Sequence, residues 1–153
     1  PVNFERGQLD YINTKYIPLK LNNANGGSLY IYPGFLVMPN KISAAFAIID
    51  FRDLRFEHHT QRFIEEDGVP SDSQVVDQTW HYVNKNGSPD KRFSNNYQIP
   101  IVHYYEINFK TEKGLNESYQ ISNPNAGQAF ASAFEKYCES LRKLNWSSVV
   151  QSD

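Results

Sequence analysis

Residues 104–137, "YYEINFKTEKGLNESYQISNPNAGQAFASAFEKY", decide the fold that we expect for this chain. In the run 101–110, Ile101, Tyr105 and Phe109 share one parity and so one face of a strand. The sequence "TEKG" then ends in a glycine, which suits the left-handed position of a short hairpin loop. The run 115–121 returns with the same alternation, so the sequence predicts an antiparallel hairpin over residues 101–121.

A helix is predicted directly after this hairpin. Asn123 is a good N-cap because its side-chain oxygen can accept from the unpaired amides of the first turn. Pro124 suits the first helical position, where its missing N–H costs nothing. Apolar residues then recur at helical spacing and predict one long amphipathic helix that must lie on the strands: Ala126, Phe130, Ala133, Phe134, Tyr137, Cys138, Leu141 and Leu144.

Upstream of the hairpin, the pattern predicts further antiparallel strands. Residues 28–39 are typical of a strand or a kinked strand pair, with Pro33-Gly34 as the break. Residues 45–51 are expected to be a strand buried on both faces at its centre, and 16–21 a short edge strand limited by Pro18. Residues 53–63 alternate until Phe63, which predicts a bulge or an end near residues 60–62. In the less regular segment 64–100 we expect a loop, a helical turn, a strand over 79–83 and a turn at Asn86-Gly87.

Composition limits the class of protein. A chain of 153 residues with 40% hydrophobic residues is expected to form one domain, residues 1–153, and ten Tyr with ten Phe favour β structure. A net charge of −2 gives no global attraction to nucleic acid or an anionic membrane. The single Cys138 excludes an intrachain disulfide, and the first residues contain no signal-peptide pattern, so we expect a cytoplasmic protein. The start at Pro1 suggests a domain of a larger protein.

Several antiparallel strands, a final hairpin and one terminal amphipathic helix resemble the pleckstrin-homology-like (PH-like) domain superfamily. In that family the last hairpin leads through a Ser- or Asn-type cap into a helix that closes one end of a two-sheet barrel. The resemblance covers residues 28–63 and 99–144 as the core, with 64–98 as an insertion, and Phe130 falls near the family's helix tryptophan. It implies a mainly β fold, an antiparallel β-barrel or two-sheet sandwich with a C-terminal capping α-helix.

Two departures from the family matter for function. The helix tryptophan is missing, and the first strand pair offers only Lys41 where phosphoinositide-binding members hold the headgroup with several basic residues. Phosphoinositide binding is therefore not expected. The segment 64–98 is also similar to a recurrent block in uncharacterised bacterial proteins, which suggests a bacterial origin.

The sequence contains no pattern that predicts a catalytic residue. His58 and His59 are strand neighbours that point to opposite faces, so they do not easily share a metal ion. Cys138 lies on the apolar stripe of the helix, where a buried and unreactive thiol is expected. A metal-dependent nuclease could use Asp90 with Glu106, but the motif's lysine is replaced by Asn108.

The stretch 80–93, "WHYVNKNGSPDKRF", is the candidate contact surface. It combines stacking and cationic groups, and the partner-binding candidates are Trp80, Tyr82, Lys85, Lys91, Arg92 and Phe93. Alternatively, Trp80 and Phe93 anchor the insertion to the core. We expect a non-catalytic interaction module without a cofactor, which binds a protein or peptide here or along a strand edge beside the helix. The alternative is a nucleic-acid-binding or metal-dependent nuclease domain, disfavoured by Asp90 and the acidic run 65–67.

Overall fold

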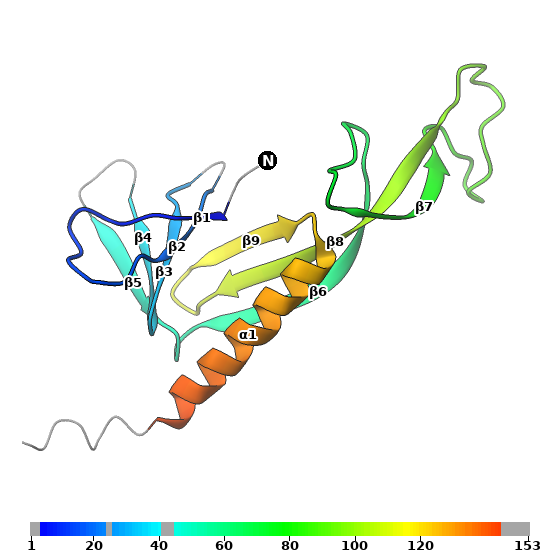
Figure 1. Cartoon of the computed structure of the whole chain (residues 1–153). Helices are drawn as coiled ribbons and strands as arrows, with labels where there is room; N and C mark the ends of the chain where they lie inside the picture. The colour runs from blue at the N-terminus through cyan, green and yellow to red at the C-terminus, as the bar shows by residue number, and fades with distance from the viewer. Residues whose placement is uncertain (1–3, 24–25, 41–44, 145–153) are drawn as a thin grey trace, which may run out of the picture. The chain divides into compact units, whose positions relative to one another are not determined.

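A computed structural model describes residues 4–23, 26–40 and 45–144. The described chain is mainly β, with two antiparallel sheets followed by one C-terminal helix (Figure 1). Its residues group into two compact units. The first contains the described residues up to Leu54 and again from Lys136, and the second is Arg55–Glu135.

The sheet of the first unit is a five-stranded antiparallel meander. Its strands follow the chain order β1-β2-β3-β4-β5 and are β1 Phe4–Arg6, β2 Leu19–Leu21, β3 Leu29–Tyr32, β4 Phe35–Pro39 and β5 Phe46–Asp50. The predicted break at Pro33-Gly34 is confirmed as the β3–β4 turn, where Gly34 has a φ of 90°. The edge position predicted for the strand after Pro18 is wrong, because β2 pairs with both β1 and β3. Pro18 is compatible with this interior position because it precedes the paired residues.

Burial in the first unit is greatest at its inner strands. Leu21, Leu29 and Leu36 are fully buried, and a neighbouring cluster is built from Leu9, Tyr32 and Val37. The strand predicted over residues 45–51 is confirmed as β5, but the prediction that its centre is buried on both faces is wrong, since Phe46 is 47% exposed and Ile48 60% exposed. The physical reason is that β5 pairs only with β4 and forms the edge of the sheet.

The sheet of the second unit is built around one long strand, β8 (Gln98–Lys110). Strand β6 (Arg55–Ile64) pairs along one side of it, while β7 (Gln74–Trp80) and β9 (Asn116–Ile121) share the other side. The predicted β8–β9 hairpin is confirmed, and Gly114 in its turn has a φ of 108°. The bulge predicted near residues 60–62 is wrong because β6 and β8 pair in unbroken register, and the register shift lies in β7 instead.

The predicted insertion, residues 64–98, contributes a strand to this sheet. Strand β7 takes the place of the predicted helical turn and ends at Trp80, where we expected a strand to begin at Thr79. Val75, Val76, Thr79 and Trp80 all favour strand structure, and the pairing partner is the first part of β8. The insertion therefore lengthens the sheet by pairing with a strand of the core.

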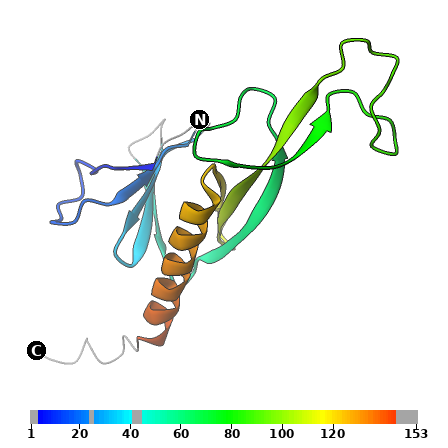
Figure 2. The ribbon, with the colours of Figure 1, turned by 45° about the vertical axis from the view of Figure 1, so that its right-hand side comes forward.

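The predicted helix is confirmed as α1, Pro124–Lys143. The amide of Ala126 donates to Asn123 Oδ1 at 3.0 Å, which is the expected N-cap bond. In the second unit the helix lies along one face of the sheet (Figure 2), where Phe134 packs edge-on against Phe56 and Phe109 with ring centroids 4.8 and 5.6 Å away. In the first unit Tyr137 packs against Phe51 at 6.0 Å.

The buried line of the helix differs in part from the stripe that its periodicity predicts. Buried positions include Phe134 and Cys138 as expected, but also Gly127 and Ala131. Ala126 and Ala133, which we placed in the stripe, are exposed, as are Tyr137 and Leu144. The helix is thus turned so that its smallest residues, and not only its apolar ones, lie against the strands.

No closed barrel is found among the strands of the described residues. Their hydrogen-bonded pairs form two separate open sheets. Within the described ranges, no helix is long and apolar enough to cross a membrane. Lys41, the one basic residue expected in the first strand pair, lies outside the described residues.

Candidate functional site

Residues 81–97 form a long connection between β7 and β8, which we call the aromatic loop. It lies at one end of the second unit's sheet, whereas the β8–β9 turn lies at the other end (Figure 1). The first residues of β8, before Ile101, pair only with β7, because β6 ends opposite Ile101. The loop therefore extends from a two-stranded part of the sheet.

Hydrogen bonds hold the aromatic loop in a defined conformation. The side chain of Asn96 acts as a substitute strand partner for Tyr82, whose amide donates to Asn96 Oδ1 at 3.0 Å. In return Asn96 Nδ2 donates to Tyr82 O at 2.8 Å. The amide of His81 donates to Tyr97 O at 2.9 Å, which closes the base of the loop. Such pairing of side chain with backbone restricts the conformations of a connection that lacks a ladder of its own.

A turn at Asn86-Gly87 was predicted, and the structure confirms it. Gly87 has a φ of 81°, and the amide of Asn84 donates to Ser88 O at 2.9 Å across the turn. An isolated bridge between Val83 and Pro89 continues the pairing.

Four aromatic rings of the loop form a continuous row. Tyr82 and Phe93 are stacked with centroids 3.8 Å apart, and His81 stacks on Tyr97 at 5.0 Å. His81 and Tyr82 meet edge-on at 4.4 Å, so the two stacks join. Phe93 is 40% exposed and Tyr97 55% exposed, which leaves a contact face at each end of the row. Trp80 is half-buried at the end of β7.

Arg92, one of the three predicted cations, is neutralised by Asp90. The buried Asp90 carboxylate accepts from Arg92 Nε at 3.0 Å and from Arg92 Nη2 at 2.5 Å. It also accepts from the Arg92 amide at 3.0 Å. The side-chain hydrogen bond from Arg92 is the main cause that holds the pKa of Asp90 below its ordinary value. Lys85 and Lys91 are exposed and make no ion pair with any described residue.

The loop also carries a shallow, open polar pocket of about 600 Å³. Lys91 and Arg92 line it together with Asn84, Ser88, Pro89 and Asp90. The structure thus brings together Tyr82 with Phe93 and Lys91 with Arg92 among the predicted contact residues. Among the described residues, Trp80 and Lys85 make no ring stacking or ion pair with the other predicted contact residues.

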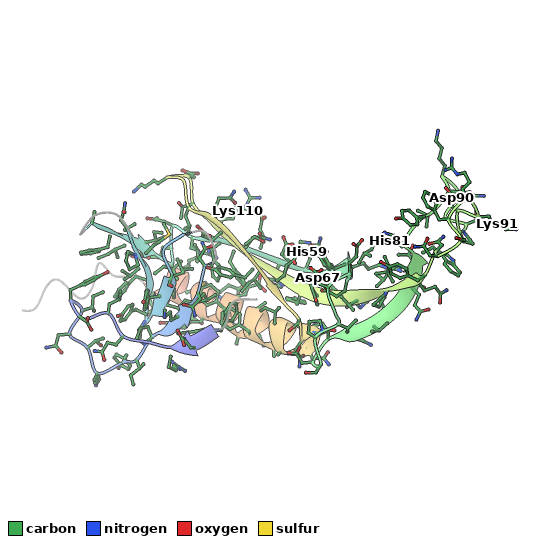
Figure 3. The ribbon with its side chains drawn as sticks, turned by 90° about the horizontal axis from the view of Figure 1, so that it is seen from above. His59, Asp67, His81, Asp90, Lys91 and Lys110 are labelled. Carbon is green, nitrogen blue, oxygen red and sulfur yellow. The ribbon has the colours of Figure 1, made fainter. Side chains whose placement is uncertain are left out.

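Asp90 and Glu106 do not share a site. Glu106 lies eight residues beyond Gln98, the start of β8, which corresponds to about 26 Å of extended strand. Asp90 lies in the loop that precedes Gln98, and Figure 3 shows it far from His59, the cross-strand partner of Glu106. Asn108 Nδ2 donates to Glu106 at 3.0 Å. Among the described residues, no group of three or more His, Cys, Asp and Glu side chains could hold a metal ion.

His58 and His59 lie on opposite faces of β6, as their alternation predicts. The half-buried His58 forms a hydrogen bond through Nδ1 with the Tyr105 hydroxyl at 2.7 Å, and its Nε2 lies 3.6 Å from Glu135 Oε2. Burial raises the pKa of the Tyr105 hydroxyl, and the nearby Glu135 carboxylate adds to the effect. His58 therefore ties β8 and α1 together within the second unit, and His59 is exposed.

Two residues on which the loop depends, Asn96 and Tyr97, were not predicted from the sequence. The only available signal was the residue type. An Asn side chain often makes hydrogen bonds to backbone groups that lack a backbone partner, and an exposed Tyr often makes contacts with other molecules. Comparison with known proteins gives no match to the chain from family models, curated proteins or solved structures.

Proposed function

We propose that this chain is a non-catalytic interaction module that binds a protein or peptide partner through the aromatic loop. The supporting observation is the row Phe93–Tyr82–His81–Tyr97, which exposes two aromatic faces on a loop already ordered by its own hydrogen bonds. Aromatic residues are enriched at protein interfaces. Because the loop is preorganised, binding costs less conformational entropy.

The charges beside the row indicate the chemistry of the partner. Lys85 and Lys91 are cations without a described ion-pair partner, and Arg92 is held by Asp90. Two free cations give a weak field, which is less than nucleic-acid binding generally uses. A protein segment with an apolar side chain flanked by acidic residues fits this surface better.

We further propose that the architecture is a variant of the PH-like fold. The order of antiparallel strands, final hairpin and capped C-terminal helix supports this proposal. The strand β7 and the aromatic loop would be the addition that distinguishes this chain from the minimal fold.

Affinity capture from the native host, read by quantitative mass spectrometry, tests the proposed function. We expect a protein that is retained by the wild type, lost by Phe93→Ala or Tyr97→Ala, and kept by the control Tyr11→Ala. Tyr11 is a suitable control because it is 53% exposed, close to the 55% of Tyr97, and belongs to the first unit. A ¹⁵N-HSQC spectrum of each variant verifies that the loop keeps its backbone structure.

Two outcomes would reject the proposal. One is that every captured protein is retained by the double variant Phe93→Ala/Tyr97→Ala. The other is salt-dependent binding of a fluorescent single-stranded oligonucleotide that Lys85→Ala/Lys91→Ala abolishes, because this would favour a nucleic-acid-binding domain.

A further inference from the structure

A second candidate site lies in the first unit, where the sheet forms an open pocket of about 640 Å³. This volume falls within the range of small-molecule sites. Its wall is largely apolar: Ile17, Pro18 and Leu19 come from the entry to β2, and Ile31 and Pro33 from β3 and its turn. The rings of Tyr16 and Tyr137 complete the apolar surface, and Ile17 is 56% exposed.

Two cations belong to the same pocket. Arg6, the last residue of β1, is fixed there because its Nη1 donates to Ile17 O at 2.9 Å. Lys15 lies with its ammonium 5.4 Å from the centroid of the Tyr16 ring, within the range of a cation–π contact. Arg6 is the register partner of Leu19, so it stands where β1 ends and β2 begins, and Lys15 lies in the segment that leads into β2.

Neither of these cations is neutralised by a described residue. Elsewhere in the unit, Lys20 pairs with Glu5 at 2.7 Å and Arg52 with Asp50 at 2.5 Å, but Arg6 and Lys15 form no such pair within the described ranges. No acidic side chain is among those that line the pocket. The pocket therefore combines an apolar wall with an uncompensated positive charge, and this combination favours a ligand that is both apolar and anionic.

We propose that this pocket binds a small amphipathic anion, with an aromatic or aliphatic body and one acidic head group. The body lies against Ile17 and Ile31, and the head group meets Arg6 and Lys15. The guanidinium of Arg6 keeps donors free beyond its bond to Ile17 O, and such a fork binds a planar carboxylate well. This site is independent of the aromatic loop, and it adds a ligand to the interaction module proposed above.

The test uses two dyes that differ mainly in charge. 8-Anilinonaphthalene-1-sulfonate has an aromatic body and an anionic head, and N-phenyl-1-naphthylamine has the same body without the head. Both are titrated into the full chain, and binding is followed by fluorescence and by ¹⁵N-HSQC spectra. We expect saturable binding of one anionic dye per chain, with the largest shifts at the amides of Arg6, Tyr16, Ile17 and Ile31. The neutral dye should bind more weakly.

A charge reversal then separates this site from general hydrophobic binding. Lys15→Glu should weaken the anionic dye by roughly three- to tenfold, as expected for a partly exposed ion pair that becomes a repulsion, and should leave the neutral dye within about twofold. Lys15 is exposed, so the variant should fold, and its HSQC spectrum verifies this. The control Lys113→Glu makes the same charge change at an exposed lysine of the β8–β9 turn and should have no effect.

Three results would overturn the proposal. They are shifts centred outside this pocket, equal affinity for the two dyes, and equal weakening by Lys15→Glu and Lys113→Glu. A loss of partner capture in the aromatic-loop variants without a change in dye binding would separate the two proposals.

Discussion

Replacement of Gly127 by alanine tests how closely α1 approaches the sheet of the second unit. Gly127 is buried in the helix opposite Tyr105 of β8. A Cβ atom added at Gly127 would lie 2.5 Å from Tyr105 Cβ and 3.0 Å from Tyr105 Cγ. The Tyr105 Cβ atom is attached directly to the strand backbone, so it cannot move aside as the end of a flexible side chain could.

Two opposing contributions decide the sign of the effect. Alanine is favoured over glycine within a helix by about 1 kcal/mol, and this alone would stabilise the variant. Carbon atoms pack best at about 3.5–4.0 Å, so the helix would have to move away from β8 by about 1 Å. Overpacking of this kind costs about 1–3 kcal/mol, and the movement would also loosen the contact of Phe134 with Phe109. We expect a net loss of up to about 2 kcal/mol in the free energy of unfolding.

Urea denaturation, followed separately by circular dichroism and by fluorescence, measures this change. Ala133→Gly is the matched control, because Ala133 is exposed in the same helix and reports helix propensity without packing. We expect the control to lose about 1 kcal/mol. The urea slope should be unchanged in both variants if the transition remains two-state.

The reasoning would be refuted if Gly127→Ala were more stable than the wild type by about the amount that Ala133→Gly loses. In that case propensity alone would describe the position. The helix would then not approach Tyr105 as closely as the structure shows.

Two further predictions concern the aromatic loop. Asn96→Ala removes two hydrogen bonds to the backbone of Tyr82, each contributing about 1 kcal/mol. Hydrogen exchange at the His81 and Asp90 amides should therefore accelerate. Unchanged exchange would contradict the role given to Asn96. Arg92→Gln should raise the pKa of Asp90 toward its ordinary value, as followed by ¹³C NMR of the carboxyl group. Because the folded pKa is lowered in the wild type, the stabilisation by this pair is present above the unfolded pKa and is lost as pH falls through the folded pKa. Amide exchange in the wild-type loop, corrected for its intrinsic pH dependence, should therefore rise in acid. Arg92→Gln keeps only the backbone amide bond to Asp90, so its response should be smaller. The same acid response in both proteins would argue against the ion pair.

Local signals in the sequence were sufficient for several elements. Asn123 and Pro124 fix the start of α1, and the glycines Gly34, Gly87 and Gly114 fix turns, because each acts on backbone groups only a few residues away. The alternation of residues 101–110 likewise identified β8 as a strand. These predictions depend on short-range geometry that the chain carries with it.

Features that depend on distant residues were predicted less well. The exposure of β5 follows from its edge position, and the interior place of β2 follows from pairing with both neighbours. For the candidate site, the sequence indicated Tyr82 and Phe93 but not that Arg92 would be held by Asp90 or that Asn96 would pair with Tyr82. Such contacts depend on how the loop closes, which residue spacing does not specify.

The sequence by itself determined the mainly β class, the hairpin of β8 with β9 and the capped helix that follows. Only the tertiary structure decided that the strands form two open sheets and that Gly127 and Ala131 lie in the buried line of α1. The tertiary structure also brought Arg6 and Lys15 to an apolar pocket, because the segments that line this pocket are separated along the chain. Propensity and capping are properties of neighbouring residues, whereas burial and strand order depend on which distant surfaces exclude water together.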